Sequence, residues 1–224
     1  FLNTLLNSGL STLQEIALDL PDMQINQVAK RLESKGWIKR KIELSCSESP
    51  KVDKTQLVRL NKEQSIAVSF IGEQAEDKRP IVLNGVTGSG KTEVYIEIIR
   101  KYLQASKQTI LLAPEITLAE HLYNRLQKVF PNSVGIAHSS YSNSQRLSTW
   151  DSCRTGELKI LIGTRSAVWT PMQNLGLIIV DEEHDSSYRQ QDGFMYSGRD
   201  TAIVRAKFEN IQIILGSATP SLET

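Results

Sequence analysis

The sequence is poor in cysteine and has no long apolar run. Its two cysteines, Cys46 and Cys153, lie far apart and outside any metal-ligand spacing. They are typical of free thiols in a reducing compartment, although a pair leaves a disulfide open. No apolar run approaches the ~20 residues of a transmembrane helix, and the N-terminus lacks a signal-peptide pattern. We therefore expect a cytoplasmic protein without a membrane partner.

The sequence also lacks an excess of charge of either sign. It has 26 basic and 25 acidic side chains, for a net charge of +1. A strongly basic footprint of nucleic-acid binding is absent, so any such binding must use local patches. The 224 residues, 40% of them hydrophobic, suffice for one α/β domain and a small appendage. Because the chain begins at Phe1 rather than Met and stops on a motif, we expect it to be part of a larger protein.

The strongest local pattern is the glycine-rich stretch at residues 85–92, GVTGSGKT. It fits the phosphate-binding pattern G-x-x-x-x-G-K-[ST], with an apolar strand-like run before it and a helical pattern after it. Glycines let several backbone N–H groups face one phosphate, Lys91 adds a positive charge, and the Thr92 hydroxyl can bind Mg²⁺. A chance glycine-rich turn is the alternative, which this context disfavours. The predicted nucleotide-binding residues are Gly85, Thr87, Gly88, Ser89, Gly90, Lys91 and Thr92.

A second motif follows the apolar run at residues 177–180 and reads Asp181-Glu182-Glu183-His184. Asp181 would hold Mg²⁺ through water beside Thr92, and Glu182 would orient or deprotonate the attacking water. The alternative is an acidic, solvated loop, which the phosphate-binding pattern at residues 85–92 disfavours. His184 could sense the terminal phosphate and relay to residues 216–219, where Thr219 lies, although a lone histidine is more often structural.

Apolar runs of strand length alternate with helical patterns after residue 80. Such alternation predicts a parallel sheet with helices on both faces, and ligands in such sheets lie beyond the carboxyl ends of the strands. The predicted strands are residues 81–83, 109–113, 134–137, 158–162, 177–180 and 211–215, and the predicted helices include 118–130 and one capped by Ser142 and Gln145.

The first 44 residues form a unit of their own. Three short helical patterns, the third at about residues 22–35, precede an alternating basic stretch at 37–44, an order that resembles a winged helix. It could bind DNA through Gln24, Gln27, Lys30, Arg31 and the basic strand, or serve packing and protein contacts, and both remain open. Residues 45–58 are predicted to be a linker, and residues 59–224 the domain that binds a nucleoside triphosphate.

Taken together, the motifs resemble superfamily-2 helicases and, more narrowly, the bacterial primosomal helicases of replication restart. The resemblance rests on residues 85–95, 113–118, 163–167, 181–190 and 216–221. It implies a RecA-like lobe of an ATP-driven 3′-to-5′ DNA helicase that acts at stalled or branched forks. It further implies forked or single-stranded DNA, other primosome proteins and single-strand-binding protein as partners.

The resemblance also assigns residues to DNA. Pro114, Thr117, Thr164 and Arg165 would follow the phosphate backbone of the bound strand. Residues 185–196 resemble an aromatic-rich loop that couples DNA binding to hydrolysis. In it Tyr188, Phe194 and Tyr196 could stack on bases and Arg189 could pair with a phosphate; the alternative is that these rings pack against the sheet.

Gln64 allows two interpretations. With Asn61 it forms a helix-capping pair for a helix whose apolar positions include Ile66, Ala67 and Phe70. It also resembles the glutamine of superfamily-2 helicases that reads adenine, because an amide can pair with both N6 and N7. The two roles are compatible.

The sequence departs from this helicase pattern in two ways. Ser197-Gly198 stands where His-Ala is expected, which puts a role for that pair in doubt. Three parts of that helicase pattern do not occur in these 224 residues: the domain that binds 3′ DNA ends, the zinc-binding cysteines, and the second lobe with its arginine fingers. Zinc is therefore expected only in the second lobe. We expect little turnover from the chain alone. The alternatives are a double-strand translocase and an interaction module with a vestigial nucleotide site.

Overall fold

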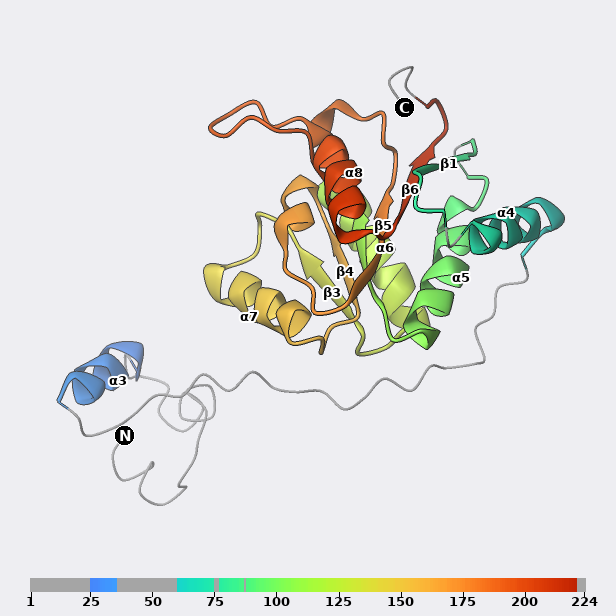
Figure 1. The fold of residues 1–224 in the computed structure, drawn as a ribbon. Coiled ribbons are helices and arrows are strands. Elements are labelled where there is room, and N and C mark those ends of the chain that lie inside the picture. Colours follow the sequence, from blue (N-terminus) through green and yellow to red (C-terminus); the bar gives the residue numbers. More distant parts are fainter. Residues whose placement is uncertain (1–24, 36–59, 75–76, 87, 221–224) are drawn as a thin grey trace. The chain divides into compact units, whose positions relative to one another are not determined.

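The computed structural model describes residues 25–35, 60–74, 77–86 and 88–220 (Figure 1). The chain divides into two compact units, Phe1–Ser45 and Cys46–Thr224. The predicted basic strand at 37–44 and the predicted linker at 45–58 lie outside the described residues, as do Gln24, Cys46 and Thr87.

Of the first unit, the structure describes one helix, α3 (Ile25–Ser34). It falls within the helix predicted at about residues 22–35. The Ser34 hydroxyl donates a hydrogen bond to the Arg31 carbonyl in its last turn, at 2.8 Å. Arg31 is exposed, as a DNA-contacting or a merely solvated arginine would be, and the winged helix stays a prediction.

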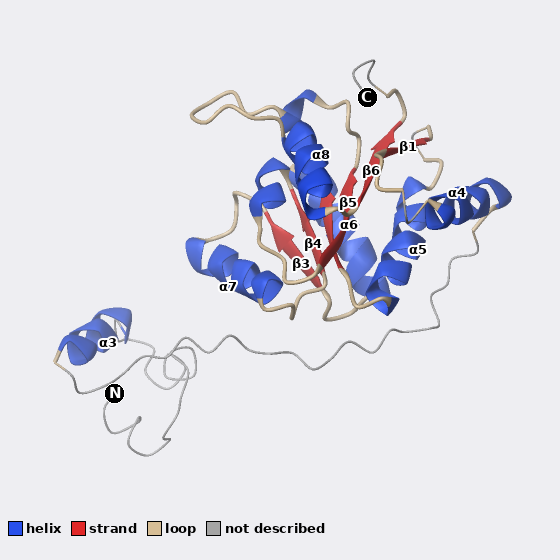
Figure 2. Cartoon of the chain, viewed as in Figure 1, coloured by secondary structure: helices blue, strands red, loops and turns tan. Residues whose placement is uncertain are grey.

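The second unit is built on a six-stranded sheet in which every neighbouring pair is parallel (Figure 2). The order across the sheet is β1-β6-β5-β2-β4-β3. The predicted parallel sheet is therefore confirmed, with each predicted strand present to within two residues at either end. The strands are β1 (Ile81–Asn84), β2 (Gln108–Leu112), β3 (Val134–Ala137), β4 (Ile160–Gly163), β5 (Leu175–Val180) and β6 (Gln212–Ser217).

Helices cover both faces of this sheet, because successive strand residues point to opposite sides. On β2, Leu111 packs in the core formed with α5 and α6, whereas its neighbours Ile110 and Leu112 pack in the core formed with α8 and η2. The helices are α4 (Lys62–Glu73), α5 (Lys91–Gln104), α6 (Ile116–Val129), α7 (Asn143–Arg154) and α8 (Gly198–Glu209), with short 3-10 helices η2 (Arg165–Trp169) and η3 (Ser186–Tyr188).

Two helices show features that the sequence pattern did not indicate. On α4 the buried residues are Val68 and Ile71, and of the three apolar positions named from the sequence only Ala67 packs against the core, whereas Ile66 and Phe70 are exposed. The reason is that α4 packs mainly against α5, and that contact uses a different stripe. The sequence reasoning missed α8 altogether, because it buries only small residues such as Ala202 and Ala206 and leaves Phe208 exposed.

The loops that carry the sequence motifs all leave the carboxyl ends of strands. Residues 85–90 follow β1, residues 113–115 follow β2, Thr164 follows β4 and Asp181 follows β5. The parallel order of the strands brings these ends to one edge of the sheet, as predicted. No helix among the described residues combines the length and the apolar character that crossing a membrane requires.

Candidate functional site

The phosphate-binding loop has the backbone that its glycines predict. Gly88 and Gly90 have φ angles of +81° and +82°, in the left-handed region that disfavours residues with a Cβ. Gly90 caps α5, and its carbonyl accepts from the backbone N–H of Glu93 at 3.0 Å. A side chain at Gly90 would also collide with the Gln64 amide. The helix therefore begins at Lys91, with its N-terminus and positive dipole end at the loop.

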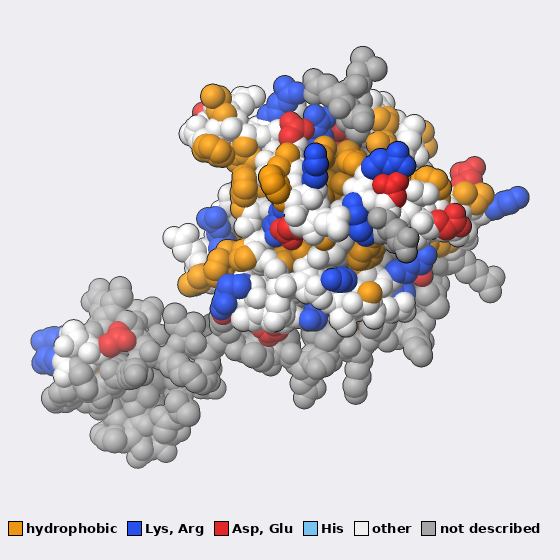
Figure 3. Space-filling model, in the orientation of Figure 1, with side chains coloured by type: hydrophobic (Ala, Val, Ile, Leu, Met, Phe, Trp, Pro, Cys, Tyr) orange, Lys and Arg blue, Asp and Glu red, His pale blue; other side chains and the backbone are white. Residues whose placement is uncertain are grey.

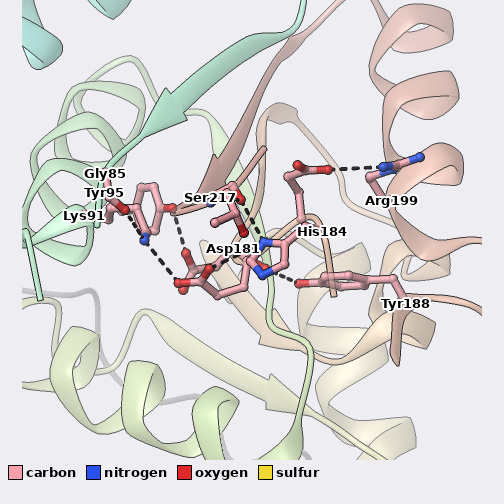
Figure 4. Close-up of polar contacts among 11 residues, drawn as sticks. Gly85, Lys91, Tyr95, Asp181, His184, Tyr188, Arg199 and Ser217 are labelled. Atoms are coloured by element: carbon pink, nitrogen blue, oxygen red, sulfur yellow. Dashed lines mark hydrogen bonds and ion pairs between the residues drawn. The ribbon is translucent and has the colours of Figure 1, made fainter. Parts of the chain in front are cut away.

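Lys91 connects this loop to the acidic motif (Figure 4). Its Nζ donates to the Gly85 carbonyl at 2.8 Å and lies 3.1 Å from Glu182 Oε1. The side chain is largely buried, so the ammonium is held in place between β1 and β5. It thus lies where both the loop and the acidic motif can act on one bound phosphate.

Asp181 is a buried carboxylate at the end of β5. The Tyr95 hydroxyl donates to its Oδ1 at 2.8 Å, from a helix 86 positions away in sequence. Burial raises the pKa of Asp181, which the hydrogen bond from Tyr95 partly opposes. Tyr95 also touches Gly216, where a side chain would collide with its hydroxyl. The sequence pattern of this helix carries no signal for this polar contact.

Glu182 is the catalytic candidate with an unusual backbone. Its φ angle is +45°, a left-handed conformation that is rare outside glycine and costs on the order of 1–3 kcal/mol. The turn is held by a bond from the Glu183 N–H to the Gly216 carbonyl at 2.9 Å. Glu183 itself is buried and pairs with Arg199 of α8 at 3.2 Å. The surrounding contacts therefore hold Glu182 in a strained backbone conformation in which its carboxylate lies beside Lys91.

His184 makes the contact that the sequence suggested. Its Nδ1 lies 2.7 Å from the Ser217 hydroxyl, and the same nitrogen is 3.8 Å from Glu182 Oε2. Ser217 Oγ in turn accepts from the Thr219 N–H at 3.0 Å. The contact between the acidic motif and residues 216–219 is confirmed through Ser217, the last residue of β6, and the relay role of His184 and Thr219 stays a prediction.

A cavity of 410 Å³ is lined by some of the predicted nucleotide-binding residues, but not by Gly85, Ser89 or Gln64. Lys91, Thr92, Asp181 and Glu182 line it, together with Gly88 and Gly90; its opposite wall comes from α6. Arg125 of α6 makes three hydrogen bonds to Glu93 of α5, from Nε to Oε1 at 3.1 Å and from Nη2 to Oε1 at 2.8 Å and to Oε2 at 3.1 Å. Sequence reasoning missed this pair, which carries no motif.

The Thr92 hydroxyl and the Asp181 carboxylate are hard oxygen donors lining the same cavity. Mg²⁺ prefers such ligands, one or two from protein and the rest from phosphate and water, so the residues present fit it. Within the described ranges there is no cluster of three His, Cys, Asp or Glu side chains able to hold a metal ion.

Gln64 uses both ends of its amide within the protein. Its Oε1 accepts from the Asn61 N–H at 2.9 Å, which confirms the capping role. Its Nε2 donates to the Ser89 carbonyl at 2.9 Å, which ties α4 to the phosphate loop. Adenine reading stays a prediction and would require the amide to exchange these partners.

A second cavity, of 510 Å³, gathers the residues predicted to follow a DNA backbone. Pro114, Thr117, Thr164 and Arg165 all line it. Glu115 also lines it, a carboxylate that the prediction did not include. Arg165 Nη1 donates to the carbonyls of Ser187 at 3.0 Å and Arg189 at 2.8 Å, so this arginine also holds the aromatic loop.

The aromatic loop divides into a buried base and an exposed tip. Tyr188 is only 1% exposed and its hydroxyl donates to the Asp181 carbonyl at 2.6 Å, so the prediction that Tyr188 stacks on bases is wrong. Phe194 is 76% exposed and stacks on Tyr196 with centroids 6.0 Å apart. Arg189 is exposed, as a phosphate contact requires.

The doubtful pair Ser197-Gly198 has a structural role. The Ser197 hydroxyl caps α8 by accepting from the Asp200 N–H at 3.2 Å. A side chain at Gly198 would come within 3.0 Å of Arg165 Cγ. The pair therefore lets α8 begin close to the arginine that holds the loop.

The chain is similar in sequence to known helicases. The DEAD/DEAH box helicase family matches residues 61–224. Curated relatives named Replication restart protein PriA are 46% identical over 200 residues in Haemophilus influenzae, 49% over 168 in Chlamydia trachomatis and 38% over 201 in Bacillus subtilis. These alignments cover 89%, 74% and 87% of this chain, but 27%, 22% and 25% of the relatives. The chain thus spans about a quarter of their length.

Solved structures agree with the fold. RecG bound to a three-way DNA junction is similar with a TM-score of 0.56 and 26% identity, over 73% of this chain and 21% of that one. Saccharomyces cerevisiae Dbp5, solved with Nup159 and Gle1, has a TM-score of 0.54 and 20% identity, over 75% and 44%, and shows the fold alone. The sheet is therefore the RecA-like sheet of a helicase lobe. On its family match, its fold and the site at the carboxyl edge of that sheet, the chain belongs to the DEAD/DEAH box helicases.

Proposed function

We propose that the chain supplies the ATP-binding motor lobe of a 3′-to-5′ DNA helicase of replication restart. The observation that carries this proposal is the convergence of Lys91, Thr92, Asp181 and Glu182 on one cavity at the carboxyl edge of the sheet. Those side chains supply a phosphate-binding cation, two metal-binding oxygens and a base for water. The names of the relatives, all replication restart proteins, support the biological setting.

Each residue of the site has a defined role toward the bound nucleotide. Lys91 Nζ exchanges its ion pair with Glu182 for the phosphate oxygens and stabilises the charge that develops on them. Glu182 is then free to orient or deprotonate the attacking water. Thr92 Oγ1 and the Asp181 carboxylate hold Mg²⁺, which neutralises phosphate charge when bound. Gln64 reads the adenine.

The path from nucleotide to DNA runs through the base of the aromatic loop. Tyr188 bonds the Asp181 carbonyl, and the neighbouring Ser187 hydroxyl donates to the Pro114 carbonyl at 2.9 Å. Arg165 bonds the carbonyls of Ser187 and Arg189. A movement of Asp181 or Glu182 can therefore be transmitted through these hydrogen bonds to the cavity that Pro114 and Arg165 line. We assign coupling to this chain of contacts, with His184 and Ser217 as a second branch.

DNA binding is assigned to that cavity and to the loop tip. Pro114, Thr117 and Thr164 would face the strand's phosphates, and Phe194 and Arg189 would reach bases and phosphates. The likeness to RecG, whose structure holds a three-way DNA junction, supports a branched DNA substrate. Other primosome proteins and single-strand-binding protein complete the proposed partners, in the cytoplasm.

The proposed domain limits are a winged helix at residues 1–44, a linker at 45–58 and the motor lobe at 59–224. The curated relatives are about four times longer than the stretch they share with this chain. Arginine fingers from a second lobe are worth about 10³–10⁵ in rate in related phosphoryl-transfer enzymes. We therefore propose that the 224 residues alone show little turnover, and that zinc belongs to the second lobe.

Lys91→Ala in the intact helicase tests the function. We expect it to abolish ATP turnover and leave binding of forked DNA largely unchanged, because the ammonium serves the phosphates and DNA contacts lie elsewhere. Lys101→Ala, on the same helix but outside the cavity, is the matched control and should keep both activities. Equal loss of turnover and DNA binding in Lys91→Ala would contradict this division.

Directionality and strand separation need a second assay. Duplexes with a 3′ or a 5′ single-stranded tail should be unwound only in the first case. ATP turnover without strand displacement on either would instead favour a double-strand translocase.

A further inference from the structure

A groove with no assigned role lies next to the proposed DNA cavity. It has a volume of 590 Å³ and is lined by the end of β3, by α7 and by η2. Arg165 at the start of η2 lines the DNA cavity, and Ser166, Ala167 and Trp169 of the same short helix line the groove. A strand in the first cavity can therefore continue over one turn of helix into the second.

Two exposed indoles line this groove. Trp169 is 56% exposed and Trp150, on α7, is 42% exposed. Trp169 also meets Tyr196 edge-on at 5.6 Å, and Tyr196 stacks on Phe194. Figure 3 shows hydrophobic side chains on this face over the protruding loop and again over α7. Trp169 thus joins the tip of the aromatic loop to the groove.

The fold holds Trp169 outward rather than leaving it loose. Arg205 of α8 donates through Nη1 to the carbonyls of Val168 at 2.5 Å and Thr170 at 2.9 Å, the residues on either side. Both neighbours are buried. The backbone is therefore fixed on both sides of an indole that faces solvent. A preorganised ring of this kind loses little entropy when a flat partner stacks on it.

The charge and the polar groups of the groove indicate which kind of ligand it can bind. Among the described residues that line it none is acidic, and Arg146 supplies an exposed cation. Asn143, Thr149 and Ser166 add hydrogen-bonding side chains. Buried His138 also lines it, and its ring nitrogens have no hydrogen-bond partner, although Nε2 lies 3.8 Å from Glu120. Aromatic rings beside a cation and polar groups suit single-stranded nucleic acid, whose bases expose flat faces and whose phosphates are anionic.

We infer that this groove binds unpaired nucleotides of a single DNA strand, with a base stacked on Trp169 and a phosphate paired with Arg146. The inference rests on the proposed function, because it extends the proposed DNA track beyond Arg165. It adds a stacking site outside the motifs and outside the aromatic loop, at Trp169, which ends the short helix η2 that Arg165 begins.

The test measures binding of a fluorescent oligothymidylate to the 224-residue chain over a series of salt concentrations that begins at low salt. Trp169→Ala should weaken binding about 10-fold with an unchanged salt slope, since stacking is not ionic, and Trp169→Phe should retain most of the affinity. Arg146→Ala should lower the salt slope by about one. Phe208→Ala is the matched control: this ring is 85% exposed on α8, outside the groove, and its loss should change nothing.

Crosslinking of iododeoxyuridine-containing strands to the unaltered chain gives an independent readout, and we expect the crosslink at Trp169 or Trp150. Binding that Trp169→Ala leaves unchanged, or crosslinks only elsewhere, would overturn this inference and leave the proposed function intact. Leu147 lines the same groove without a ring; if Leu147→Ala weakens binding as much as Trp169→Ala, bare apolar contact rather than base stacking explains the site. No oligonucleotide binding by the unaltered chain would contradict this inference and the DNA-binding role together.

Discussion

Replacement of Tyr188 by alanine should unfold the motor lobe at a markedly lower temperature. The ring is 1% exposed and lies in the core formed by β5, β6 and α8, so its removal opens a cavity. Loss of a buried aromatic side chain costs about 3–5 kcal/mol. For a domain of this size each kcal/mol lowers Tm by about 2–4 °C, which predicts a fall of about 6–20 °C.

Two further variants separate the causes. Tyr188→Phe keeps the ring but removes the hydroxyl that bonds the Asp181 carbonyl, so it should cost about 1–3 kcal/mol. Phe194→Ala truncates the exposed ring of the same loop and should change stability by less than about 0.5 kcal/mol. In the intact helicase, Phe194→Ala should nonetheless lower DNA-stimulated ATP turnover more than basal turnover.

Thermal unfolding of the three variants by circular dichroism decides the matter. A Tm order of Phe194→Ala above Tyr188→Phe above Tyr188→Ala supports the division into a buried base and an exposed tip. An unchanged Tm in Tyr188→Ala would refute it and return Tyr188 to the surface as a candidate for stacking.

Three other changes have definite outcomes. Glu182→Gln in the intact helicase should bind ATP but lose turnover by about 10²-fold or more, measured by phosphate release; normal turnover would mean that another group positions the water. Burial raises the pKa of Asp181, so its ionised form destabilises the fold once the pH rises through that raised pKa. Asp181→Asn should therefore raise Tm at neutral pH, and the gain should vanish below the ordinary value of 3.8; a lower Tm at neutral pH would contradict this. Gly216→Ala should lower Tm, because the added methyl collides with the Tyr95 hydroxyl and costs about 1–3 kcal/mol; an unchanged Tm would show that Tyr95 moves aside freely.

The sequence by itself determined what depends on neighbours along the chain. The loop at residues 85–92, the strand runs and the capping pair of Ser142 and Gln145 are each set within a few residues. Glycine conformation, period-2 apolar runs and capping bonds are local, so they could be predicted. The meeting of the motifs at one edge also followed, because parallel strands place all their carboxyl ends together.

Only the tertiary structure decided which side chains became buried. The strand order β1-β6-β5-β2-β4-β3 is not the order in sequence, and it puts Tyr95 beside Asp181 and Tyr188 beneath β5. The same packing exposes Phe70 on α4, covers the loop base with α8 and holds Trp169 outward through Arg205. Each of these depends on which elements pack together across the sheet, and residue spacing within one segment carries no information about that.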